Sequence, residues 1–216
     1  MARYLTELIG TFFLVFVIGM TSVGGVAAAP IAIGCTLMVM VYMGGHVSGA
    51  HYNPAVSIAV FLRGALEKRE VVPYIAAQLF GAWLAAEAVL VVTGSTFSPA
   101  PGAGYPTVAV LLSEVLMTFA LVLVILNVAT SPATEGNSYY GLAIGFTVLA
   151  GAYAVGPVSG GAFNPAVGFG PILVDALAGD GSFGNLWYYM VGPVAGGLLA
   201  VPVFLKQNPE GASDEA

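Results

Sequence analysis

The strongest constraint on the fold is a nine-residue pattern that occurs twice, Ser-Gly-x-x-x-Asn-Pro-Ala-Val at residues 48–56 and 159–167. In both copies Asn is a favourable helix N-cap, and Pro suits the first helical position, where its missing N–H costs nothing. The apolar run that begins within the first copy has eight residues, 55–62, which at about 1.5 Å each cover roughly 12 Å. Because a bilayer core is about 30 Å thick, each copy predicts a half-helix that enters a membrane without crossing it. Irregular backbone at that depth is tolerated only inside protein or beside a wet cavity, so both copies should flank a pore or a binding site.

The composition is that of a membrane protein. Hydrophobic residues make up 58% of the 216 residues, charged residues only 7%, and the mean hydropathy is +0.93. A soluble domain normally carries about a quarter charged residues, which excludes that class. The single cysteine, Cys35, excludes an intramolecular disulfide and a cysteine metal cluster. We expect no catalytic residue, no metal, no cofactor and no nucleic-acid partner.

Six apolar segments are candidates to span the bilayer. They cover residues 4–23, 31–43, 72–93, 107–130, 140–155 and 187–205. The second and fifth look short because each is expected to run directly into a half-helix loop, at residues 44–46 and 156–157. The sequence therefore predicts an all-α integral membrane protein with six transmembrane helices and two re-entrant half-helices.

The basic residues predict the orientation. With six spans and an internal N-terminus, all five fall on the cytoplasmic side: Arg3, Arg63, Lys68, Arg69 and Lys206. Both termini should therefore be cytoplasmic, in a multi-pass protein of the cell membrane. Each repeat holds three spans, an odd number, so the repeats, about 1–94 and 107–206, have opposite orientations within one channel domain, residues 1–216. Residues 207–216 would then form a cytoplasmic tail.

Together these motifs resemble those of the aquaporin (major intrinsic protein) superfamily. Besides the two Asn-Pro-Ala boxes, a Glu-x-x-x-Thr pair opens each half, at 7–11 and 114–118. Gln78 and Gly81 in the third span and the segment 187–193 in the sixth extend the similarity over nearly the whole chain. The resemblance implies the inverted-repeat aquaporin fold, passive conduction of water and small neutral solutes through a lipid bilayer, and a homotetramer.

In that family the two boxes meet at the centre of the pore. The box residues in this chain are Asn53, Pro54, Ala55, Asn164, Pro165 and Ala166. Two facing helix N-termini each contribute roughly half an elementary positive charge, which makes the midplane unfavourable for cations. Each asparagine can cap its own helix through its oxygen and offer an amide N–H to the lumen, which breaks a continuous proton wire. By resemblance, the acceptors along the path are the carbonyls of Gly49, Ala50, His51, Gly160, Gly161 and Ala162.

Two acidic residues, Glu7 and Glu114, lie inside apolar spans. Intramembrane carboxylates are functional candidates by default, and a proton relay is one reading. We favour structural bracing, because symmetry-related carboxylates can accept hydrogen bonds from the exposed N–H groups of the re-entrant loops, as their counterparts do in the family. Gln78 should brace a loop in the same way. Glu87, near the end of the third span, has no partner that the sequence identifies.

The chain departs from the family pattern at Val167, where most members carry Arg at the outer constriction. Carried over by spacing from each Asn, this filter consists of Ile33, Ala152, Gly161 and Val167. None is charged, aromatic or histidine, so the mouth should be wide and weakly polar, which lowers the cost of admitting solutes less polar than water. The pattern is similar to that of plant tonoplast intrinsic proteins, which admit water, ammonia and urea. Glycerol and hydrogen peroxide are further candidate solutes.

Other positions of the pore follow from the same resemblance. The apolar walls are expected at Leu14, Leu37, Leu121 and Val148. Cys35 lies two residues from Ile33, about 200° around a helix with 3.6 residues per turn, and should face away from the lumen. An aromatic side chain of the loop 94–106, Phe97 or Tyr105, could fold back and narrow the mouth.

Two other classes of function compete with a channel. A secondary transporter also uses inverted repeats with broken helices, and would need a coupling-ion site, for which only Glu87 remains unassigned. A structural membrane protein of the same fold would have a blocked pore. An enzyme is disfavoured, because His46 and His51 have no third metal ligand nearby and Ser48 belongs to the glycine-bearing motif.

Overall fold

The computed structural model describes residues 1–209, and these form an all-helical bundle without strands. Its helices are α1 (Ala2–Val23), α2 (Ala29–Ser48), α3 (Pro54–Leu62), α4 (Lys68–Thr93), α5 (Thr107–Thr130), α6 (Tyr140–Ser159), α7 (Pro165–Ala178) and α8 (Leu186–Gln207), with short 3-10 turns η1 (Pro132–Thr134) and η2 (Phe183–Asn185). Six helices in the described part are long and apolar enough to cross a membrane. The prediction of six spans and two half-helices is therefore confirmed. Most of the predicted tail, residues 210–216, lies outside the described residues.

The predicted ends of the second and fifth spans were wrong. Residues 44–46 lie inside α2, which continues to Ser48, and residues 156–157 lie inside α6, which continues to Ser159. Both helices end instead at a glycine in the left-handed conformation, Gly49 and Gly160. Glycine is the residue that ends helices most readily in this way, so the helix stops at the second residue of the repeated motif.

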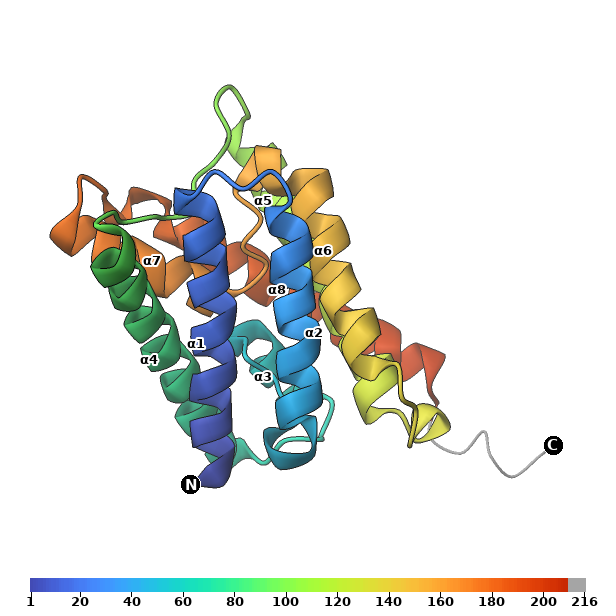
Figure 1. Cartoon of the computed structure of the whole chain (residues 1–216). Helices are drawn as coiled ribbons and strands as arrows, with labels where there is room; N and C mark the ends of the chain where they lie inside the picture. Colours follow the sequence, from blue (N-terminus) through green and yellow to red (C-terminus); the bar gives the residue numbers. More distant parts are fainter. Residues whose placement is uncertain (210–216) are drawn as a thin grey trace.

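The half-helices α3 and α7 enter the bundle from opposite sides. Figure 1 shows α3 in the half of the bundle that holds the N-terminus and α7 in the other half. We call these halves the N-terminal side and the opposite side. Each half-helix packs against the last full helix of the other repeat, α3 against α8 and α7 against α4. The two repeats therefore complete each other's interior.

Glycine allows the central helices to approach closely. A methyl group added to Gly34 of α2 would lie 2.7 Å from the carbonyl oxygen of Gly145 in α6, and one on Gly145 would meet the carbonyl of Gly34. Between α4 and α1, a methyl group on Gly81 would lie 2.5 Å from the Leu8 carbonyl. Small residues are the usual means of helix packing in lipid, where hydrophobicity does not drive helices together.

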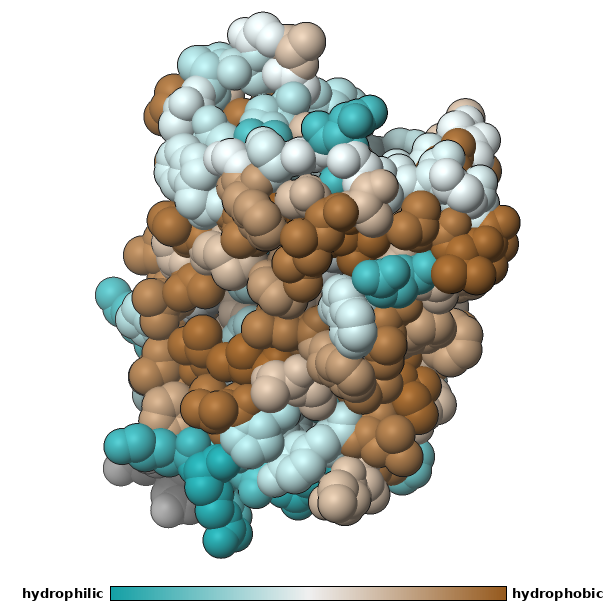
Figure 2. Space-filling model, turned by 90° about the vertical axis from the view of Figure 1, so that its left-hand side faces the viewer, coloured by the Kyte–Doolittle hydropathy of each residue, from teal (hydrophilic) through white to brown (hydrophobic). Residues whose placement is uncertain are grey.

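The outer surface matches a membrane environment. Figure 2 shows a broad hydrophobic band across the face seen there, with hydrophilic residues above and below it. One small hydrophilic patch interrupts the band. The exposed hydrophobic residues of α4 include Val72, Phe80, Val91 and Val92. Such a band is expected for a surface in contact with lipid chains.

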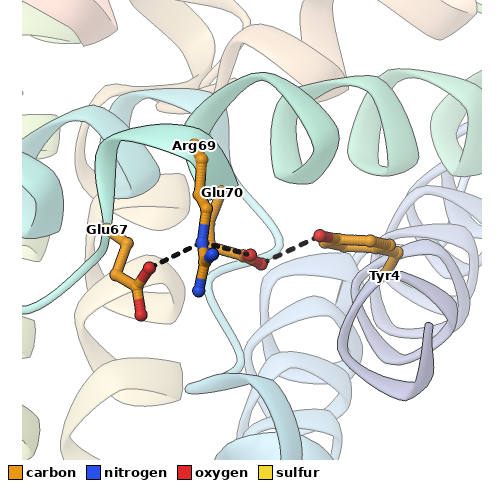
Figure 3. Close-up of polar contacts among 4 residues, drawn as sticks. All are labelled: Tyr4, Glu67, Arg69 and Glu70. Atoms are coloured by element: carbon orange, nitrogen blue, oxygen red, sulfur yellow. Dashed lines mark hydrogen bonds and ion pairs between the residues drawn. The ribbon is translucent and has the colours of Figure 1, made fainter.

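A polar cluster ties α1 to α4 on the N-terminal side. The Tyr4 hydroxyl donates to Glu70 Oε2 at 3.0 Å, and Arg69 lies between Glu70 and Glu67, with Nε 2.7 Å from Glu67 Oε2 (Figure 3). Tyr4 also packs edge-on against Tyr74 of α4, with ring centroids 6.0 Å apart. Because the Arg69 side chain is 78% exposed, its ion pair adds little stability. Tyr74 is the buried member of this cluster, and it lies next to the first re-entrant loop.

Candidate pore

Two asparagines cap the half-helices at the centre of the bundle. Asn53 Oδ1 accepts from the Ala55 amide and Asn164 Oδ1 accepts from the Ala166 amide, each at 2.9 Å. Both asparagines have extended backbone conformations, as N-cap residues do, and a proline follows each at the first helical position. The side chains are almost fully buried, so the caps lie inside the protein rather than at its surface.

The same asparagines bind the opposite loop. Asn53 Nδ2 donates to the Phe163 carbonyl and Asn164 Nδ2 donates to the Tyr52 carbonyl, both at 2.9 Å. An amide group has two N–H donors, so each asparagine retains one after this bond. Both side chains line the central cavity, which leaves the second N–H available to a molecule inside it.

Each loop contains backbone in the left-handed region before its asparagine. In the first loop Ala50 and Tyr52 have φ of 51° and 50°, and in the second Phe163 has φ of 51°. Gly161, at the position equivalent to Ala50, has φ of 66°. Left-handed conformations cost free energy in residues other than glycine, so the surrounding contacts must hold these loops in place.

Glu7 supplies most of those contacts for the first loop. Its carboxylate accepts from the Ser48 hydroxyl at 2.6 Å, and from the amides of His51 and Tyr52 at 2.9 and 2.7 Å. Gln78 Nε2 completes the set at 2.8 Å. Four donors surround a side chain that has no exposed surface, so the carboxylate is well solvated by the protein itself.

Glu114 occupies the symmetry-related place beside the second loop. It accepts from the Ser159 hydroxyl at 2.8 Å and from the amides of Ala162 and Phe163 at 3.1 and 2.7 Å. This set repeats the hydroxyl and the two loop amides that surround Glu7, and it likewise pairs backbone N–H groups that the loop leaves free. Each re-entrant loop is therefore held by one carboxylate from the first helix of its own repeat.

Two tyrosines that the sequence analysis missed complete the support of the loops. The hydroxyls of Tyr74 and Tyr189 donate to the carbonyls of Ser48 and Ser159, at 2.8 and 2.7 Å. Each carbonyl belongs to the last residue of a helix, where backbone acceptors lack a partner within the helix. The spacing of the two tyrosines, 115 residues, is close to the repeat interval and was the signal available.

A further polar network supports the first loop. Gln78 Nε2 also donates to Ser57 Oγ at 2.9 Å, and Ser57 Oγ lies 3.0 Å from His51 Nδ1. These side chains come from the loop, from α3 and from α4, so the network fixes the loop against both helices. The sequence suggested Gln78 as a brace but gave no indication of its contact with Ser57.

A central cavity is flanked by one cavity on the opposite side and by two on the N-terminal side. The central one is the smallest, about 50 Å³, and it meets a cavity of about 310 Å³ on the opposite side at Ile33, Ala152 and Gly161. Two cavities of about 500 and 410 Å³ lie on the N-terminal side, one meeting it at Ile144 and the other at His51. The asparagine pair therefore lines the smallest of these four cavities.

Every residue expected in the filter or the apolar wall lines the central cavity. These are Ile33, Ala152, Gly161, Val167, Leu14, Leu37, Leu121 and Val148. Among the loop residues, Ala50, His51 and Ala162 also line it. Gly160 instead lines the opposite-side cavity, and Gly49 lines the two N-terminal-side cavities. The structure thus brings these candidates together around the central cavity and the cavities that share lining residues with it.

Charge is distributed unequally along the path. Among the described residues, no Lys, Arg, Asp or Glu lines the central cavity or the opposite-side cavity. The N-terminal-side cavities are lined by Arg3, Arg63 and Glu135. The Arg63 guanidinium is held by the Thr130 hydroxyl and carbonyl, at 2.9 and 2.8 Å, and lies over the Phe204 ring.

The remaining candidates from the sequence lie away from these cavities. Glu87 accepts a hydrogen bond from Trp83 Nε1 at 3.1 Å, one turn earlier in α4. Cys35 is half-buried and lines none of the four cavities. Phe97 packs against Gly19 of α1, and Tyr105 is 47% exposed; neither lines the opposite-side cavity.

Comparisons with known proteins identify relatives of this chain and of its fold. The sequence model of the family described as Major intrinsic protein matches residues 1–204. The chain is 38% identical over 207 residues to "Aquaporin NIP1-1" of Zea mays, a match that covers 91% of this chain and 71% of that protein. It is 35% identical over 214 residues to "Glycerol uptake facilitator protein-like 6" of Lactiplantibacillus plantarum, covering 93% and 95%. A solved structure, the aquaglyceroporin from Plasmodium falciparum, shares the fold with a TM-score of 0.84, 22% identity and 94% coverage of both chains.

Proposed function

Since the chain belongs to the major intrinsic protein family of membrane channels, we propose that it conducts water and small neutral solutes passively. The solutes we propose are ammonia and urea, with glycerol and hydrogen peroxide as further candidates. Protons and other ions are excluded. The relatives include both a protein named as an aquaporin and one named as a glycerol uptake facilitator, which supports a neutral substrate without selecting one.

The observation that carries the solute proposal is the apolar lining of the path between the asparagine pair and the opposite-side cavity. The side chains of Ile33, Ala152 and Val167 offer no hydrogen-bond donor there, and among the described lining residues no fixed cation takes the place of a filter arginine. A solute with fewer hydrogen bonds than water loses less on entering such a site. A small side chain at position 152 and none at 161 favour molecules wider than water.

Exclusion of protons is proposed to depend on the centre. The N-termini of α3 and α7 bring positive helix ends to the asparagines, and the free amide N–H groups can only donate. A water between them accepts from both sides and cannot pass a proton along the axis. The same field opposes the entry of cations.

The surroundings of the channel are proposed as follows. The N-terminal side faces the cytoplasm in the cell membrane, because the cytoplasmic side of a membrane protein carries the excess of Lys and Arg. Four copies assemble into a tetramer with one pore in each. The two repeats span about residues 1–94 and 107–206.

Stopped-flow swelling of proteoliposomes in urea, ammonia, glycerol and sorbitol gradients tests the proposal. We expect rapid, non-saturating entry of urea and ammonia, with no change in internal pH beyond that caused by ammonia itself. Permeability to water alone would contradict the wide filter. Saturable or pH-coupled flux would favour a transporter, and loss of that coupling in Glu87→Gln would place the coupling site there. Absence of any permeability above that of protein-free vesicles would favour a structural role.

A further inference from the structure

The second re-entrant loop lacks the polar network that supports the first. The positions equivalent to His51 and Ser57, 111 residues later, are Ala162 and Gly168. Pro193 lies 115 residues after Gln78, the interval that relates the two loop-binding tyrosines. None of the three can supply a side-chain hydrogen bond. Loop 160–164 therefore keeps its carboxylate and tyrosine contacts but has no counterpart of the Gln78 network.

A segment of the α4–α5 connection, residues 95–102, lies over this loop, and we call it the strap. The Gly102 amide donates to the Val158 carbonyl at 3.0 Å, just before the loop begins. A methyl group on Gly160 would lie 2.9 Å from the backbone nitrogen and oxygen of Ala100. Backbone of the strap is thus in direct contact with the loop residue that precedes the filter position Gly161.

The strap is fastened to α7 through one carboxylate. Thr96 Oγ1 donates to Asp175 Oδ1 and Ser98 Oγ donates to Asp175 Oδ2, both at 2.6 Å. Hydrogen bonds of this length to a carboxylate are among the stronger ones in proteins. The Asp175 carbonyl also accepts from the amides of Gly179 and Gly181, at 2.9 and 3.2 Å, which fixes the end of α7.

Phe97 gives the strap a third attachment. Its ring occupies the space that a side chain at Gly19 of α1 would fill, and it packs against the main hydrophobic core. The strap therefore joins α1, α7 and the second loop, and its two hydroxyls and its aromatic ring alternate along residues 96–98.

From these contacts we infer that Asp175 is a positioning residue for the filter: through the strap it sets the backbone of Gly160 and Gly161, and so the solute selectivity. The inference rests on the proposed function. Gly161 has no side chain, so the opening at that position is bounded by backbone, and a shift of the loop changes the opening directly. When the strap is released from Asp175, it no longer occupies the space next to the second loop, and the loop can move away from the lumen into that space.

The test compares Asp175→Ala with the double variant Thr96→Val/Ser98→Ala, which removes the same two bonds without altering α7. Asp175→Asn is the conservative variant, since its amide oxygen can accept a hydrogen bond from one hydroxyl and its amide N–H can donate to the other. Ser182→Ala is the matched control, because Ser182 caps η2 next to the end of α7 and makes its side-chain hydrogen bond to the Gly184 amide rather than to the strap. Hydrogen exchange of the peptide covering residues 157–163 reports loop opening, and swelling reports selectivity.

We expect both bond-removing variants to raise exchange in this peptide and to raise the glycerol-to-water permeability ratio by roughly threefold or more. The Asn and Ser182 variants should resemble the wild type. Unchanged exchange would overturn the inference, and so would raised exchange with an unchanged ratio. If the wild type conducts water alone, the proposed wide filter fails. In that case hydrogen exchange and water permeability test the strap. A change in both in the bond-removing variants supports its role in positioning the loop, and unchanged exchange overturns it.

Discussion

At the scale of single residues, two buried carboxylates determine whether the loops can hold their conformation. Glu7 and Glu114 accept hydrogen bonds from hydroxyl and N–H groups, and among the described residues no cation lies within salt-bridge distance of either. Their charge is balanced by backbone N–H groups that would otherwise be unpaired in the membrane interior. Without the loop the carboxylate would be buried without donors, and without the carboxylate the loop N–H groups would be buried without an acceptor. Each therefore removes the desolvation cost of the other.

Replacing Glu7 with Gln should destabilise the fold. The new amide would place an N–H donor against two of the four existing donors, because each carboxylate oxygen accepts from two of them, and the buried donors left unpaired cost about 3 kcal/mol. Thermal unfolding in detergent, followed by tryptophan fluorescence, measures the shift. Glu87→Gln is the control, because Glu87 is half-buried and has one bond within its own helix. Equal melting temperatures for the Glu7 variant and the wild type would contradict the bracing role.

Replacing Val167 with Arg should narrow the solute range. A guanidinium at this position adds hydrogen-bond donors and a longer side chain beside the apolar Ile33 and Ala152, so urea permeability should fall by about tenfold or more while water permeation persists. Swelling assays on the same vesicle preparation give both values. Val167→Leu adds volume without charge and separates the two effects. Urea flux that is indifferent to the arginine would place the filter elsewhere.

At the scale of elements, the crossing of α2 and α6 leaves little room for change. Gly34 and Gly145 face each other's carbonyls, so neither position can accept a methyl group without a shift of the helices. Gly156 lies about three turns farther along α6. Nothing lies within 4 Å of a methyl group added there, so the same helix offers a crowded and an open glycine for comparison.

Gly145→Ala should therefore destabilise the protein, and Gly156→Ala should not. Forcing a methyl group against the Gly34 carbonyl separates α2 from α6 and costs about 1–3 kcal/mol. Thermal unfolding of the two variants in the same detergent measures the difference. Because both substitutions give the same change in helix propensity, a shared shift would show that close packing at this crossing contributes little.

The elements also show what the sequence could and could not predict. The half-helices were predictable because Asn and Pro mark a helix start and the following apolar run is too short to cross a bilayer. The ends of α2 and α6 were not, because Gly44 and Gly45 in α2 and Gly156 and Pro157 in α6 look like breakers. Gly44 is instead required by packing, since a methyl group there would meet the Tyr52 hydroxyl.

The candidate pore residues were predictable to the extent that they repeat. The family resemblance, carried over by spacing from Asn53 and Asn164, selected residues that line one cavity. The strap was not predictable, because it occurs once and depends on contacts between Thr96 or Ser98 and a residue almost eighty positions away. Such contacts follow from the three-dimensional arrangement, and no periodic pattern marks them.

At the scale of the whole molecule, the proposed orientation follows from the charge distribution. With the N-terminal side in the cytoplasm, residue 104 in the α4–α5 connection is external and residue 135 in the α5–α6 connection is internal. Both are exposed loop positions. A cysteine at Gly104 adds local backbone strain, because φ there is 82°, but no neighbouring atom lies within 4 Å of a side chain added at this position.

A membrane-impermeant maleimide should label Gly104→Cys on intact cells and should label Glu135→Cys only after permeabilisation. Both variants are made with Cys35→Ser, which removes the single native cysteine. Labelling before and after permeabilisation, followed by mass spectrometry, gives the result. The reverse pattern would mean that the protein is inserted with its N-terminus outside.

The crossed bonds from Asn53 to Phe163 and from Asn164 to Tyr52 have a consequence for biosynthesis. A ribosome delivers the first asparagine 111 residues before the second, so the earlier half emerges with its key acceptor still unmade. The centre formed by the two asparagines can consequently be completed only after the second loop has been made, and a nascent chain that stops before Phe163 lacks it.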